Sequence, residues 1–190
     1  WIGSLRVGRW GGSGGVGVTE VLVESGEGRL KAPEWLGLSL AVVNTLRSTV
    51  VSGRRELVDR WVTELSEEGL VSRLVNVDYA SHSAEVDPIL SELESLLSDL
   101  APQAGQVAMV STVTGTRCEG TTLDGAYWCR NLRQTVRLDS ARAELIGGGH
   151  GVFVEESGHP GLARPLSTGS GEREGVVGGA LGGAAGGLAG

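Results

Sequence analysis

The chain has 190 residues, of which 40% are hydrophobic, so it can bury one core or two small ones. A formal net charge of −7 and a pI near 5.0 argue against a nucleic-acid-binding surface and suit a soluble protein. Two cysteines, Cys118 and Cys129, are too few for a disulfide framework or a metal cluster, which favours a reduced, cytoplasmic setting.

No targeting segment is visible, because no run is long and apolar enough for a membrane span and no signal peptide can be recognised. The first residue is Trp1, so we expect the chain to be a piece of a longer polypeptide. The tail, residues 167–190, is rich in glycine and alanine and is expected to be a flexible linker.

Residues 1–15 form a glycine-rich stretch in which residues 11–15 match the G-x-S-x-G pattern of a nucleophile elbow at Ser13. An elbow requires a buried strand before its serine, and residues 1–10 predict none. The glycines therefore favour a flexible turn leading into a strand at residues 16–23.

Residues 16–75 predict a small α/β unit. Residues 38–43 and 48–52 are apolar and β-branched and predict a hairpin. Residues 55–68 carry a helical apolar stripe, and Gly69 provides a stop signal. The apolar run 70–77 predicts a short buried strand. Strand, hairpin, helix and strand in this order indicate a ferredoxin-like subdomain.

The turn after residue 77 carries His82, and an amphipathic helix follows it. Pro88 suits the first turn of that helix, whose apolar face is expected to pack in a core. This face consists of Val86, Ile89, Leu90, Leu93, Leu96, Leu97 and Leu100. An imidazole on a turn between strand and helix is a candidate general base, because its pKa lies near neutrality. It could equally be a surface or capping histidine.

The remaining elements continue an α/β pattern. A strand is predicted at residues 106–112 and a polar loop at 114–125. Helices are predicted at residues 126–134 and 140–146, and a closing strand at 151–155.

Residues 77–83, Val-Asp-Tyr-Ala-Ser-His-Ser, resemble the Tyr-Ala-Ser-His motif of acyltransferase domains in modular type I polyketide synthases. Residues 110–115, 127–137 and 149–155 resemble further motifs of that family, in the same order and at similar spacing. The resemblance is strong from about Leu38 to Leu166. It implies that residues 76–166 are the C-terminal part of an α/β-hydrolase-like acyltransferase domain, into which the ferredoxin-like subdomain is inserted.

The resemblance also implies roles for particular residues. His82 would be the catalytic base, and the main-chain carbonyl of Asn131 would orient it. Tyr79, Ala80 and Ser81 would line the pocket for the extender unit, and the family's motif correlates with methylmalonyl in preference to malonyl. Asn44 matches an asparagine near the acyl-CoA site, although a role as turn former is at least as well supported.

In the family, a serine in a Gly-His-Ser elbow attacks an acyl-CoA thioester and passes the acyl unit to the phosphopantetheine thiol of an acyl carrier protein. No bound cofactor and no metal are implied; the partners are the carrier protein and neighbouring synthase domains. The sequence contains no Gly-His-Ser-x-Gly. We therefore expect the nucleophile to lie outside this chain, and the chain alone to be inactive. Arg6 is a candidate for binding the substrate carboxylate.

Two other functions remain open from the sequence. The chain could be a non-catalytic piece that docks a carrier protein or a neighbouring domain. It could also be another serine hydrolase of α/β type that uses Ser13, which would require Ser13 to lie near His82.

Overall fold

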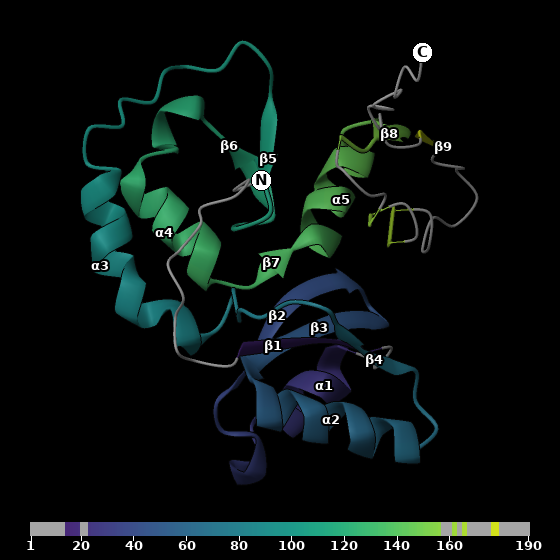
Figure 1. The fold of residues 1–190 in the computed structure, drawn as a ribbon. Coiled ribbons are helices and arrows are strands. Elements are labelled where there is room, and N and C mark those ends of the chain that lie inside the picture. The colour runs from purple at the N-terminus through teal and green to yellow at the C-terminus, as the bar shows by residue number, and fades with distance from the viewer. Residues whose placement is uncertain (1–13, 20–22, 157–160, 163–164, 167–175, 179–190) are drawn as a thin grey trace, which may run out of the picture.

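The structure is a computed structural model that describes residues 14–19, 23–156, 161–162, 165–166 and 176–178 (Figure 1). Ser13 and Arg6 lie outside the described residues, and so does most of the tail. Among the described residues, no helix is long and apolar enough to cross a membrane.

The N-terminal elements form the predicted ferredoxin-like unit, with the order βαββαβ, of which the first helix was not predicted. They are β1 (Gly14–Thr19), α1 (Val23–Leu30), β2 (Leu38–Thr45), β3 (Ser48–Arg54), α2 (Arg55–Glu67) and β4 (Ser72–Val75). The sheet has the order β4-β1-β3-β2, and these four strands pair antiparallel. The hairpin and α2 are confirmed, and Gly69 stands after α2 with φ +78°.

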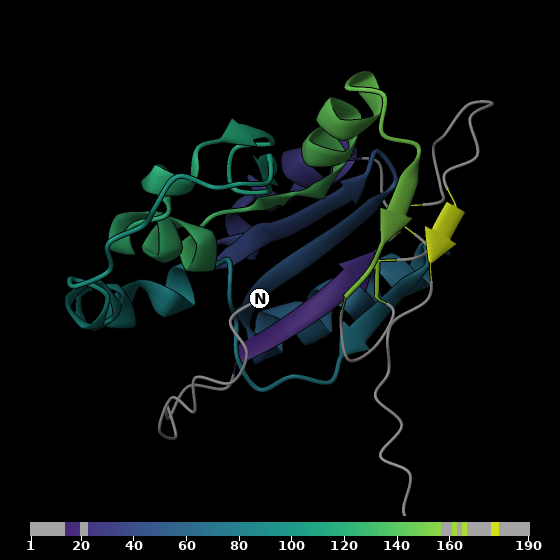
Figure 2. The ribbon, with the colours of Figure 1, turned by 90° about the horizontal axis from the view of Figure 1, so that it is seen from above.

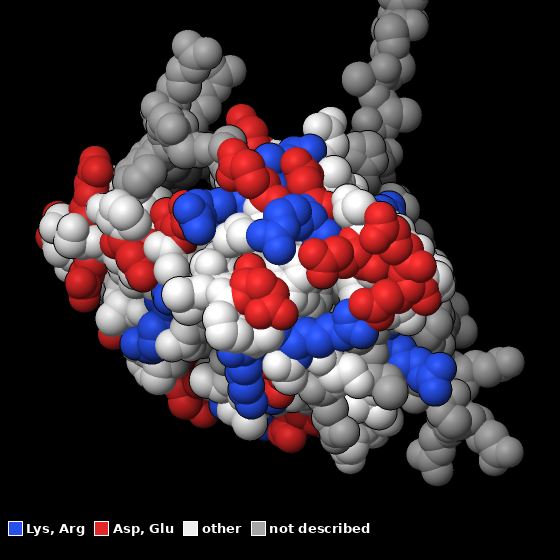
Figure 3. Space-filling view, turned by 90° about the horizontal axis from the view of Figure 1, so that it is seen from below, with Lys and Arg blue, Asp and Glu red and all other residues white. Residues whose placement is uncertain are grey.

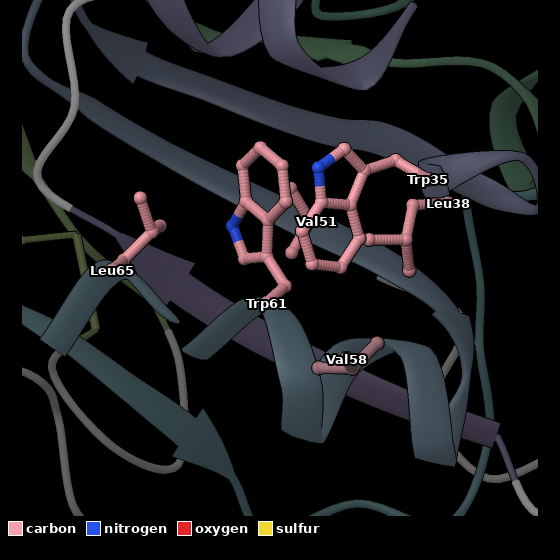
Figure 4. Close-up of a cluster of buried hydrophobic side chains, with 6 residues drawn as sticks. All are labelled: Trp35, Leu38, Val51, Val58, Trp61 and Leu65. Carbon is pink, nitrogen blue, oxygen red and sulfur yellow. The ribbon is translucent and has the colours of Figure 1, made fainter. Parts of the chain in front are cut away.

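A core cluster lies between this sheet and its two helices, which both cover the same face (Figure 1). Trp35 and Trp61 meet edge to face, with ring centroids 4.9 Å apart, and Val51 lies beside them (Figure 4). The outer side of the helical layer carries charges of both signs over its surface (Figure 3). Helix α2 carries the ion pairs Arg55–Asp59 and Arg60–Glu64, whose members are spaced one helical turn apart.

The C-terminal helices lie on the side of the sheet away from α1 and α2 (Figure 1), beyond its end and edge. The helices are α3 (Asp87–Leu96), α4 (Gly125–Arg133) and α5 (Leu138–Gly147), and the strands are β5 (Met109–Ser111), β6 (Thr116–Cys118), β7 (Val136–Arg137), β8 (Val152–Val154) and β9 (Val176–Gly178). Short 3-10 helices occur at Pro33–Trp35, Ala84–Val86 and Gly120–Thr122. β5 pairs with β6, and β8 pairs with β9, which lies in the tail expected to be a linker.

One short strand joins the two parts of the chain. β7 pairs parallel with β2, with Val42 opposite Val136, and so becomes the fifth strand of the ferredoxin-like sheet. Seen from above, the C-terminal helices stand along one end and one edge of that sheet (Figure 2). This pairing was not predicted, because a two-residue strand is too short to produce a recognisable strand pattern.

Two predictions about apolar segments are wrong. The run 70–77 was expected to be a buried strand, but β4 is an edge strand in which Arg73 and Leu74 are exposed. The leucine face after His82 was expected to be entirely core, yet α3 ends at Leu96, and Leu96 and Leu100 are 68% and 43% exposed. Only Val86 and Leu93 of that face are buried.

Candidate functional site

The His82 backbone has an unusual conformation. His82 is the one non-glycine residue with a positive φ among the described residues, at +60°. A residue with a side chain has a higher energy in this left-handed conformation, and residues held in it often lie at functional sites.

Gly14 of β1 packs closely against the same loop: a Cβ at position 14 would lie 2.6 Å from the Ala80 nitrogen and 2.7 Å from the Tyr79 carbonyl carbon. Glycine at this position lets the sheet support the turn directly.

The C-terminal end of α4 holds His82 at two points. The His82 backbone N–H donates to the Leu132 carbonyl at 2.8 Å. The Nδ1–H of its ring donates to the Gln134 carbonyl at 2.9 Å. The last carbonyls of a helix have no partner within the helix and carry the negative end of its dipole. His82 satisfies the Leu132 carbonyl and places its imidazole at this negative end.

These contacts define the chemical state of the imidazole. A carbonyl can only accept a hydrogen bond, so Nδ1 carries the proton and Nε2 keeps a free lone pair. Burial lowers the pKa of His82, while the carbonyls of Gln134 and Asn131 act in the opposite direction and reduce that shift. The net result is a pKa below the ordinary 6.5, so the ring is neutral near pH 7 and Nε2 can accept a proton.

Helix α4 is held in place at both of its ends by hydrogen bonds and an ion pair. Asp124 caps its N-terminus by accepting a hydrogen bond from the Tyr127 N–H at 2.7 Å. The Tyr127 hydroxyl and Ser111 Oγ, both buried, lie 2.8 Å apart and hold the helix against β5. At the other end, Arg133 forms an ion pair with Asp87 of α3. This framework sets the position of the carbonyls that contact His82.

An open cleft of about 460 Å³ lies beside the imidazole, between the ferredoxin-like sheet and the end of α4. Besides His82 it is lined by Ser39, Leu40, Val113, Arg133, Gln134, Thr135 and Arg137. A substrate group in this cleft would lie near a neutral imidazole and two arginines, Arg137 and Arg133, of which Arg133 is already paired with Asp87. The cleft therefore suits a polar or anionic reactant that loses a proton.

The other residues singled out from the sequence lie at varying distances from this cleft. Tyr79, Ala80 and Ser81 share the loop of His82; Ala80 is buried, Ser81 is partly buried and Tyr79 is 59% exposed. None of the three lines the cleft as the described residues form it. Asn44 lies towards the end of β2, where its Nδ2 donates to Ser48 Oγ at 3.4 Å across the hairpin.

The carbonyl bonded to Nδ1 was not predicted. Asn131 was expected to orient the ring, and its carbonyl is close enough to raise the pKa of His82. Nδ1 donates its hydrogen bond, however, to the carbonyl of Gln134, the C-cap residue that follows α4. Every residue has a carbonyl, so the sequence contains no side-chain signal for this choice.

Neither a metal nor a thiol nucleophile is indicated at this site. Among the described residues, no group of three or more His, Cys, Asp or Glu side chains is placed to hold a metal ion. Burial raises the pKa of both Cys118 and Cys129, so each is a neutral thiol at pH 7 and a poor nucleophile.

The fold agrees with the comparisons to known proteins. Residues 11–183 match the profile of the acyl transferase domain, and the chain belongs to that family. It resembles the acyltransferase domains of modular polyketide synthases in particular. Against the solved acyltransferase domain from module 8 of the salinomycin polyketide synthase, the TM-score is 0.78 at 43% identity, over 82% of this chain and 36% of that one.

Two curated relatives are similar over much of this chain. It is 48% identical to polyketide synthase GfsA of Streptomyces halstedii over 126 residues, which is 66% of this chain and 2% of GfsA. It is 42% identical to the spectinabilin polyketide synthase system protein NorA' of Streptomyces orinoci over 173 residues, 90% of this chain and 5% of NorA'. The chain thus spans a small part of each of these relatives.

The protonation state of His82 can be measured directly. Because burial lowers its pKa, we expect the His82 ring to titrate below the ordinary value of about 6.5, and to keep the Nδ1–H tautomer above that point. Nitrogen-detected NMR of the ring would report both quantities. A His82 pKa above 6.5, or a proton on Nε2 at pH 8, would contradict the assigned state.

Proposed function

We propose that the chain is the C-terminal part of an acyltransferase domain that loads a methylmalonyl extender unit from CoA onto an acyl carrier protein. In this proposal His82 is the catalytic base, and a serine in the part of the parent domain outside this chain is the nucleophile. The observation that carries the proposal is the His82 turn, where a neutral imidazole is fixed through Nδ1 with Nε2 free beside an open cleft. The membership of the acyl transferase family supports it.

The reaction proceeds in two transfers. The serine hydroxyl attacks the thioester carbonyl while His82 Nε2 takes its proton; the C–O bond forms, the C–S bond breaks, and the proton passes to the departing CoA sulfur. The carrier protein's pantetheine thiol then attacks the acyl-serine ester. His82 takes the thiol proton and returns it to the serine oxygen. During each transfer the carbonyls of Gln134 and Asn131 favour the imidazolium.

The choice of methylmalonyl rests on the loop before the base. Tyr79, Ala80 and Ser81 precede His82, and malonyl-selective relatives of this family tend to carry His-Ala-Phe at these positions. A phenylalanine next to the histidine would crowd the methyl branch, whereas Ser81 leaves that space open. A methyl group contributes only about 1–3 kcal/mol of discrimination in an apolar pocket, so the preference should be strong without being absolute.

The test is a competition between extender units. We expect the intact parent domain, given equal malonyl-CoA and methylmalonyl-CoA, to place mostly methylmalonyl on the carrier protein. Replacing Tyr79→His and Ser81→Phe together should move the ratio towards malonyl by about tenfold or more. Mass spectrometry of the carrier protein identifies the acyl group. Predominant malonyl transfer by the unaltered domain would contradict the methylmalonyl assignment.

A second variant leaves the loop intact and tests the role of Asn44. Asn44→Ala alters the hairpin end of β2, where the side chain contacts Ser48. If Asn44 only forms the turn, the extender ratio is unchanged. A changed ratio would instead support the alternative that Asn44 contributes to the acyl-CoA site.

A further inference from the structure

The carbonyl that holds the His82 ring belongs to a segment fastened to the ferredoxin-like subdomain. Gln134 is followed directly by Thr135 and then by β7, which pairs with β2. The Thr135 hydroxyl donates to the Leu40 carbonyl of β2 at 2.7 Å. The residue directly after the carbonyl bonded to Nδ1 thus contacts the other subdomain.

Strand β2 is irregular at the point where Thr135 binds. In its pairing with β3 the register shifts between Leu40 and Val42. Leu40 itself stays in register with Val51, next to this irregularity. The Thr135 hydroxyl donates to its carbonyl, which makes Leu40 an attachment point in the sheet for the segment.

Backbone pairing alone gives β7 little support. It consists of Val136 and Arg137, and on its other side the Arg137 N–H donates to the Thr112 carbonyl at 2.7 Å. All of these contacts lie after Thr135 in the chain. Between them and the end of α4, the bond from the Thr135 hydroxyl to the Leu40 carbonyl ties the segment to β2 through a side chain, and the Gln134 N–H donates to the Arg130 carbonyl at 2.8 Å.

We propose that Thr135 is a positioning residue for the base. Its bond to Leu40 sets the place of the Gln134 carbonyl, and through that carbonyl the orientation and basicity of the His82 ring. The ferredoxin-like sheet thereby becomes part of the device that orients the base in the larger subdomain. This inference rests on the proposed role of His82, and its test separates the two.

The test compares Thr135→Val with Thr135→Ser in the intact parent domain. Valine has nearly the shape of threonine but no hydroxyl, so the segment loses its bond to Leu40 and the Gln134 carbonyl is held less firmly, by backbone bonds alone. We expect kcat for transacylation to fall by about ten- to hundredfold, with KM changed less than about threefold. Serine keeps the hydroxyl and should restore most of kcat.

The pH dependence provides a readout that a general loss of stability would not change. The Gln134 carbonyl raises the pKa of His82, so weakening this bond lowers that pKa further. Because the neutral ring is the active form, the acid limb of the kcat profile should move to lower pH in Thr135→Val and return in Thr135→Ser.

Thr122→Val is the matched control. The Thr122 hydroxyl also donates to a backbone carbonyl at 2.7 Å, that of Glu119, but it lies outside the cleft. We expect this variant to keep the wild-type kcat and acid limb. If Thr135→Val fails to fold, Thr135→Ala makes the same comparison, because alanine also lacks the hydroxyl.

The outcomes separate this inference from the proposed function. Wild-type kcat and an unmoved acid limb in Thr135→Val, with His82→Asn inactive, would overturn the positioning role and leave the function intact. Equal losses in Thr135→Val and Thr122→Val would also overturn it. Activity in His82→Asn would defeat the proposed function itself.

Discussion

His82→Asn in the intact parent domain should reduce kcat for acyl transfer by about a hundredfold or more while leaving the fold in place. Asparagine tolerates the left-handed backbone, which His82 occupies at φ +60°, better than most residues. Its amide can also donate to the Gln134 carbonyl, which accepts from Nδ1 in the native chain. What it cannot do is accept a proton, so the variant removes only the chemistry assigned to Nε2.

Two controls make this loss specific. His150→Asn changes an exposed histidine whose ring lies 3.1 Å from the Leu145 carbonyl, away from the cleft, and should keep wild-type kcat. Circular dichroism and the unfolding midpoint of His82→Asn should match those of the native domain. Near-native turnover in a folded His82→Asn domain would refute the role of base.

Trp61→Ala should cause the largest loss of stability of any single truncation in the ferredoxin-like core. Trp61 is 2% exposed and packs between α2 and the sheet, edge to face with Trp35. Removing a buried tryptophan side chain costs about 3–5 kcal/mol, because apolar burial is lost and a cavity remains. Urea unfolding of the 190-residue chain, followed by circular dichroism, measures the free energy of unfolding.

The indole nitrogen of Trp61 allows a second comparison. Nε1 is buried and has no hydrogen-bond partner among the described residues, so a phenylalanine would lose no polar contact. Trp61→Phe should therefore cost less than Trp61→Ala, while Leu36→Ala, at an 82% exposed side chain, should change stability by less than about 0.5 kcal/mol. A Trp61→Ala loss below about 1 kcal/mol would mean that the core is not organised around this residue.

The sequence predicted those elements whose apolar pattern was complete. Helix α2 and the β2–β3 hairpin show clear helical and extended periodicity, and both are confirmed. Helix α1 was missed because its eight residues include Gly26 and Gly28 and no apolar stripe. The leucines around Leu96 were misjudged because periodicity shows which residues share a face, but not whether anything covers that face.

At the site, the proposed base could be anticipated from the sequence, and the groups that hold it could not. His82 lies on a recognisable turn in a recognisable motif. Gln134 contributes a main-chain carbonyl, which carries no signature in the sequence. The Thr135 hydroxyl donates to the carbonyl of Leu40, which is 95 positions away in the sequence and is brought near only by the fold. Contacts of this range depend on the pairing of β2 with β7, which pattern reasoning did not predict.

The most direct test of the account follows the first transfer alone. The intact parent domain is mixed with methylmalonyl-CoA without carrier protein, and its intact mass is recorded over the first seconds, for the native and His82→Asn proteins. The account predicts rapid gain of one methylmalonyl unit by the native domain, on a serine outside residues 1–190, and at least about a hundredfold slower gain by His82→Asn. Equal rates of acylation in the two proteins, or an acyl group carried by a residue of this chain, would contradict it.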